Sequence, residues 1–183
     1  MRGEGEPRIA IENQFQGLIV GSELEAAVTE FANAAMRADA IDPRITELVR
    51  LRCAGVHDCR VCGSLRLADA LAEGLEDDVA QKVAAYETAG FDPAAVAALR
   101  LVDAIILTPG AVDEDLAEEL HRHFTDAQIA EICLDVVKWS HQKVLVALRL
   151  EKPPWGDERT VLSFDAEGDA VIGGPVRDFV AGG

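Results

Sequence analysis

The stretch that most constrains the fold of this chain is residues 44–74, which centre on Cys59-Arg60-Val61-Cys62. Two cysteines three residues apart at the start of a helix lie on one face, close enough to form a disulfide. Asp58 is a suitable N-cap and Gly74 a suitable stop, so the sequence predicts one helix that runs from the cysteines to Gly74. The unpaired N–H groups at the start of such a helix lower the pKa of a thiol. The pattern therefore indicates a reactive dithiol.

The rest of the chain favours helices over sheet. Alanine and leucine dominate, and runs of β-branched residues are short. Apolar residues recur at helical spacing between capping residues and glycine or proline stops. The predicted helices cover residues 22–37, 43–56, 76–88, 93–108 and 113–124, and a long apolar run over residues 125–150 is either one buried helix or a broken pair.

The domain plan has three parts. Residues 1–21 form an N-terminal arm without periodicity, residues 22–152 a helical domain, and residues 153–183 a C-terminal extension. The extension carries two short β-type runs at residues 160–164 and 170–172, which predict a hairpin. The tail from Gly173 is expected to be partly mobile. The predicted class is therefore all-α, with a small C-terminal β-hairpin appendage.

Charge and composition exclude several classes of function. The net charge is −16, so no basic stripe is available to bind nucleic acid or an anionic membrane surface. No apolar run reaches the ~18 residues that a membrane span requires, and the N-terminus has no apolar signal region. We expect a cytoplasmic protein. In that compartment a Cys-x-x-Cys pair is more often redox-active or metal-binding than structural.

A family resemblance is carried by two motifs. Arg44-Ile45-Thr46-Glu47-Leu48-Val49-Arg50-Leu51-Arg52, followed by Cys59-Arg60-Val61-Cys62, resembles the carboxymuconolactone decarboxylase and alkyl hydroperoxidase D (AhpD-like) superfamily. The resemblance implies an AhpD-like all-helical domain that assembles as a homotrimer or homohexamer and needs no cofactor. It also implies thiol-dependent reduction of a small-molecule peroxide.

The resemblance assigns roles to three residues. Cys62 would be the peroxidatic thiol, Cys59 the resolving thiol and Glu47 the carboxylate that helps to move the proton. In this chemistry the Cys62 thiolate becomes a sulfenic acid, and Cys59 condenses with it to a disulfide. An external dithiol then reduces the disulfide.

The chain departs from the family pattern four residues after Cys62. Arg66 stands there in place of a histidine. A guanidinium can stabilise a thiolate, bind an anionic group of a substrate or pair with Glu47, but it cannot shuttle a proton because it stays protonated. His57 and His141 are the candidates for a displaced proton relay.

Other interpretations remain open. The cysteines could be inert core residues, as we expect for Cys53 and Cys133. A zinc site built from Cys53, His57, Cys59 and Cys62 would be crowded onto a single helix–turn–helix, and no second Cys-x-x-Cys exists, so we expect no metal. A lyase or isomerase acting on a small carboxylated lactone held by Arg66, or a non-catalytic ligand-binding oligomer, are the alternatives to a thiol-dependent peroxidase or thiol–disulfide oxidoreductase.

Overall fold

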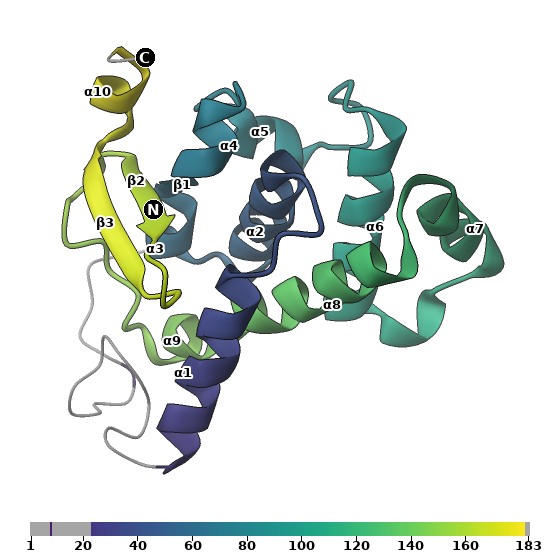
Figure 1. Ribbon diagram of the computed structural model, residues 1–183, viewed down its shortest axis with the longest axis horizontal. Helices are drawn as coiled ribbons and strands as arrows, with labels where there is room; N and C mark the ends of the chain where they lie inside the picture. The colour runs from purple at the N-terminus through teal and green to yellow at the C-terminus, as the bar shows by residue number, and fades with distance from the viewer. Residues whose placement is uncertain (1–7, 9–22, 182–183) are drawn as a thin grey trace.

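The computed structural model describes Arg8 and residues 23–181, so the predicted N-terminal arm lies outside the described residues apart from Arg8. The chain forms a helical body with a small sheet at one side (Figure 1). The helices are α1 (Glu23–Met36), α2 (Pro43–His57), α3 (Arg60–Gly63), α4 (Ala68–Ala72), α5 (Val79–Ala84), α6 (Pro93–Leu107), α7 (Glu114–His123), α8 (Asp126–Ser140), α9 (Lys143–Leu148) and α10 (Val176–Ala181). The strands are β1 (Leu65–Leu67), β2 (Thr160–Phe164) and β3 (Ala170–Pro175), and a 3-10 turn (Pro109–Ala111) follows α6.

Helix α2 lies at the centre of the body, between the sheet on one side and α6 on the other (Figure 1). The side chain of Asp42 caps its first turn by accepting from the N–H of Arg44. The core between α2, α6 and α8 is made of wholly buried aliphatic side chains, among them Val49, Leu99 and Ile132. This burial fixes the position of α2, which carries Glu47 and leads directly to the cysteines.

The predicted helix from the cysteines to Gly74 is wrong beyond its first turn. Helix α3 ends at Gly63, strand β1 follows, and the chain resumes as the short helix α4. Asp58 is not the N-cap of α3: it ends α2 in the left-handed conformation, with φ 56°, and Cys59 takes the N-cap position. The helix is interrupted because β1 pairs in parallel with β2, with Leu65 opposite Thr160. The local periodicity of the sequence cannot predict pairing with a strand so far along the chain.

The C-terminal hairpin is confirmed, and it is integrated with the helical body. Strand β2 is central in the sheet order β1-β2-β3 and pairs antiparallel with β3. Leu162 of β2 belongs to the main core. Strand β3 continues to Pro175 and helix α10 follows, and the partial mobility expected of the tail from Gly173 stays a prediction. The predicted class, a helical domain with a small β element, is confirmed.

The long apolar run over residues 125–150 is a broken pair. Helix α8 opens with the capping box of Thr125 and Gln128, and α9 follows after a short turn. Val146 of α9 packs against the cysteines. In the described part of the chain, no helix has the length and apolar character needed to cross a bilayer.

Candidate active site

The two cysteines of the Cys-x-x-Cys turn are bonded to each other. Cys59 and Cys62 form a disulfide, with their Cα atoms 5.3 Å apart. The N–H of Cys62 also points to the Sγ of Cys59, at 3.3 Å. Both residues are buried, in a small apolar cluster with Ala54 and Val146. The structure is therefore that of the oxidised pair, held by the first turn of α3.

Cys62, and not Cys59, lines a cavity of about 180 Å³. Helix α9, the segment that follows it and the hairpin give the cavity mostly apolar walls. The polar and charged residues among its lining are Arg50, Lys138, Gln142 and Glu151. The lining residues are Arg50, Val61, Cys62, Leu65, Lys138, Trp139, Gln142, Leu145, Leu150, Glu151, Trp155, Leu162, Phe164, Ala170 and Ile172. The cavity thus places one sulfur of the disulfide, that of Cys62, beside space for a small, largely apolar molecule.

A buried ion pair contacts the backbone of the cysteine turn. Glu47 and Arg50 are each 1% exposed, and their side chains meet at 2.6 and 2.8 Å. Arg50 also donates to the carbonyl oxygens of Cys62 and Leu65, each at 2.6 Å. Glu47 therefore reaches the cysteine turn through Arg50, and the pairing of Glu47 with Arg66 that the sequence suggested is wrong.

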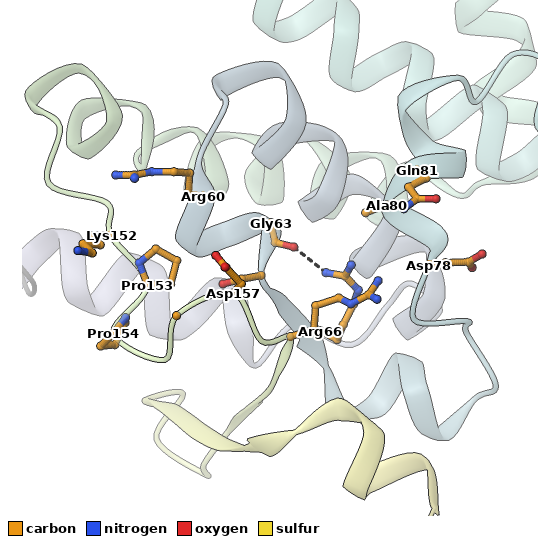
Figure 2. Close-up of a pocket in the computed structure, with 13 residues that line it drawn as sticks. Arg60, Gly63, Arg66, Asp78, Ala80, Gln81, Lys152, Pro153, Pro154 and Asp157 are labelled. Atoms are coloured by element: carbon orange, nitrogen blue, oxygen red, sulfur yellow. Dashed lines mark hydrogen bonds between the residues drawn. The ribbon is translucent and has the colours of Figure 1, made fainter. Parts of the chain in front are cut away.

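Arg66 lies in β1 and not on the helix of the cysteines. Its guanidinium is buried and donates to the backbone carbonyls of Gly63, Leu65 and Asp77. Figure 2 shows the bond to Gly63 at the edge of a separate, larger cavity of about 1120 Å³. Burial lowers the pKa of Arg66 from its ordinary value. Because β1 replaces the expected helical turn, Arg66 is held by backbone carbonyls and is not among the residues that line the cavity of Cys62.

Lys138 of α8 is an unusual cation in the cavity of Cys62. Its Nζ lies 3.2 Å from the centroid of the Trp139 ring and 5.3 Å from that of Phe164. The ammonium donates to the Sδ of Met36 at 3.2 Å. Burial, and then the charge of Arg50, lower the pKa of Lys138 to about 7, although Asp135 opposes them. An amine with such a pKa exchanges its proton near neutral pH.

The two histidines proposed as relays do not line this cavity. His57 is half-buried at the end of α2, and neither ring nitrogen has a hydrogen-bond partner among the described residues. Burial, and then the nearby Lys143, lower the pKa of its imidazole. His141 is exposed at the C-terminal end of α8. Their roles as proton relays stay predictions.

The remaining thiols are poor candidates for chemistry. Cys53 is wholly buried, and burial raises the pKa of its thiol to about 12. Cys133 is half-buried, and burial raises its pKa as well. Over the described ranges, no group of three or more His, Cys, Asp or Glu side chains is arranged to hold a metal ion.

Sequence reasoning missed four residues of the cavity. Arg50 stands three residues after Glu47 on a predicted helix, and this spacing was a usable signal for their ion pair. Lys138 beside Trp139 carried a weaker signal, a charge within an apolar run. Glu151 lies at the end of the predicted helical domain and Trp155 in the extension after it, and no local pattern places either residue at the cysteines. Trp155 donates to the Oγ of Ser64 at 3.0 Å and so fastens this segment to the cysteine turn.

Comparison with known proteins shows a similarity to one family. Fold and site define a helical protein with a disulfide-bonded Cys-x-x-Cys pair beside a small apolar cavity. Residues 22–104 match the model of the carboxymuconolactone decarboxylase family. The first part of the helical domain is thus similar to the carboxymuconolactone decarboxylase family.

Two curated relatives and one solved structure extend the comparison. Two uncharacterized proteins of Mycobacterium tuberculosis, from two strains, are each 34% identical over 180 residues, which is 92% of this chain. The chain spans 63% of the length of these relatives. A crystal structure from Agrobacterium tumefaciens, of a protein of unknown function put forward as the antioxidant defence protein AhpD, is similar with a TM-score of 0.61. It is 20% identical, and the match covers 72% of this chain and 91% of that one, so the likeness is one of fold.

Proposed function

We propose that this protein is a thiol-dependent peroxidase for small organic hydroperoxides, with Cys62 as the attacking thiol and Cys59 as the resolving thiol. The observation that carries the proposal is that Cys62 lines the apolar cavity while its disulfide partner Cys59 does not. A peroxide in the cavity would meet Cys62 first, and Cys59 stands close enough to close the disulfide afterwards. The match of residues 22–104 to the family model is consistent with a peroxidase-like or a decarboxylase-like role.

The reaction needs only groups that the chain supplies, together with a reductant. The Cys62 thiolate attacks the terminal peroxide oxygen, the O–O bond breaks, and an alcohol leaves after taking up one proton. The resulting sulfenic acid condenses with the Cys59 thiol, which forms the disulfide and releases water. An external dithiol then reduces the disulfide and is itself oxidised. The chain would work as a homo-oligomer, a trimer or a hexamer.

In this scheme the charge beside the thiol comes from Arg50 rather than from Arg66. The guanidinium of Arg50 is fixed against the Cys62 carbonyl by its pairing with Glu47. A cation held in a buried site stabilises a neighbouring thiolate. We therefore propose that Glu47 orients Arg50. Another group then transfers the thiol proton.

The test is a rapid-mixing experiment on pre-reduced protein. Cumene hydroperoxide and hydrogen peroxide are each mixed with it, and mass spectrometry follows the Cys59–Cys62 disulfide. We expect one equivalent of peroxide to be consumed for each disulfide formed, with the organic peroxide reacting faster. Cys62→Ser should abolish consumption, whereas Cys59→Ser should consume one equivalent and stop at the sulfenic acid, which dimedone traps.

The matched control is Cys53→Ser, which alters a wholly buried thiol outside the cavity. It should leave peroxide consumption unchanged. If the wild-type thiols stay reduced in the presence of both peroxides, the proposal is wrong. A decarboxylase-like lyase or a ligand-binding role would then be the better explanation of the cavity.

A further inference from the structure

The proposed chemistry requires a group that takes the thiol proton and returns it to the leaving alkoxide. No histidine is among the residues that line the cavity of Cys62. Its ionisable residues besides Cys62 are Arg50, Glu151 and Lys138. Arg50 stays protonated in proteins and cannot serve. Glu151 is buried, and one of its carboxylate oxygens already accepts a hydrogen bond from Arg60 at 3.1 Å.

Lys138 differs from the other cations of the site in its surroundings. Its ammonium is held by the ring faces of Trp139 and Phe164 and by the sulfur of Met36. No carboxylate of the described residues forms an ion pair with it, and cation–π and sulfur contacts stabilise a charge less than an ion pair does. Lys138 can therefore lose its proton and become a neutral amine, whereas Arg50 cannot lose its charge.

The charged groups around Lys138 come from several elements. Arg50 of α2 disfavours the ammonium, whereas Asp135 on its own helix favours it. Glu151, from the segment after α9, and Cys62 of α3 line the same cavity. Phe164 of β2 and Met36 of α1 contribute no charge. The net result is a pKa of about 7, the range in which a group both accepts and donates protons efficiently.

We propose that Lys138 is the proton carrier of this site, in the place of the histidine that the family pattern puts four residues after the second cysteine. The inference rests on the proposed peroxidase function. The neutral amine of Lys138 takes the proton of the Cys62 thiol, directly or through one water molecule in the cavity. The thiolate then attacks the peroxide, the S–O bond forms as the O–O bond breaks, and the Lys138 ammonium gives its proton to the departing alkoxide. The amine is neutral again at the end.

Two substitutions separate proton transfer from simple charge. Lys138→Met keeps the aliphatic stem against Trp139 but removes the amine. Lys138→Arg keeps a positive charge that cannot be given up. Lys82→Met, which changes an exposed lysine of α5, is the matched control. Each variant is reduced before the assay. Circular dichroism compares its helix content with that of the wild type.

The first measurement is the rate of Cys62 alkylation by iodoacetamide as a function of pH, which needs no peroxide. In the wild type the rate should rise through pH about 7, where the amine loses its extra proton. In Lys138→Met the rise should move toward the ordinary thiol pKa of about 8.5, with at least a roughly tenfold loss of rate at pH 7. Lys138→Arg should keep rapid alkylation, because its fixed charge still stabilises the thiolate.

The second measurement is organic hydroperoxide reduction at pH 7. Both Lys138→Met and Lys138→Arg should be slower than wild type by about tenfold or more, and Lys82→Met should be unchanged. In Lys138→Ala, methylamine should restore part of the rate, because a small amine fits the space that the side chain leaves. Equal peroxide rates in wild type and Lys138→Met would overturn the inference and leave the proposed function standing. A wild type that reduces no peroxide but keeps the Lys138-dependent alkylation profile would overturn the proposed function and support the proton coupling.

Discussion

The Nη1 of Arg50 donates to the carbonyl oxygen of Cys62 at 2.6 Å, and this bond joins the central helix α2 to the turn that carries the disulfide. The same guanidinium is held by both carboxylate oxygens of Glu47, at 2.6 and 2.8 Å. All these groups are buried, so the position of the turn is tied to the position of the ion pair. Stability and chemistry share these residues, and the predictions below are designed to separate the two.

Removal of one partner of the buried pair should strongly destabilise the protein. Arg50→Met leaves the Glu47 carboxylate buried without its cation, and we expect a loss of about 3–5 kcal/mol in the free energy of unfolding. The double variant Glu47→Gln, Arg50→Met should be more stable than Arg50→Met alone, because the stranded charge is gone. Urea unfolding measures both. Arg44→Met, which breaks an exposed pair with Asp42, is the control and should have little effect.

The apolar wall of the cavity should select organic over inorganic peroxide. Leu145→Ala shortens a side chain of α9 that lines the cavity. Each methylene contact with a substrate is worth about 1–3 kcal/mol, so kcat/KM for cumene hydroperoxide should fall about tenfold or more. The value for hydrogen peroxide, which has no apolar part, should hardly change. Leu24→Ala, at an exposed position of α1, serves as the control. An equal loss for both peroxides would show that the wall acts on folding and not on selection.

The turn of the hairpin should tolerate no side chain at Gly168. Its φ is +89°, and an added Cβ would lie 2.5 Å from the carbonyl oxygen of Asn33 in α1. Gly168→Ala should therefore cost about 1–3 kcal/mol of unfolding free energy through overpacking, in addition to backbone strain. Gly90→Ala shares a positive φ but has open space around it, so it isolates the strain alone. Equal losses in the two variants, measured by thermal unfolding at matched conditions, would argue against the contact with α1.

Asp135 should make stability depend on pH. Burial, and then the neighbouring Glu131, raise the pKa of Asp135 from 3.8 to about 7. Because the folded state binds the proton more tightly than the unfolded chain, this group lowers stability as pH rises from about 4 to 7. Asp135→Asn should remove this pH-dependent loss of stability. The unfolding free energy of the variant relative to the wild type should therefore increase across this pH window, by about 1.4 kcal/mol for each unit by which the pKa of Asp135 is raised. Urea unfolding at several pH values measures the difference, and a difference that stays constant with pH would refute the prediction.

Local signals determined most of the helical frame. The Asp42 cap, Pro43 and the Thr125–Gln128 capping box are short-range devices, and α2 and α8 begin where these residues predict. The alternating apolar runs after residue 159 likewise predicted the β2–β3 hairpin. The cysteine spacing indicated a pair able to form a disulfide, and the structure contains that disulfide. Each of these features depends on residues a few positions apart, so the sequence alone was sufficient for them.

Tertiary structure decided where the cavity lies and what surrounds Cys62. Parallel pairing with β2 turned the residues after α3 into β1, and this moved Arg66 from a helix face to a set of backbone carbonyls. The same packing brought Lys138 and Trp155 beside the cysteine turn. Burial then gave Lys138 its low pKa. These properties depend on contacts between distant segments and on the exclusion of water, so they exist only in the folded chain.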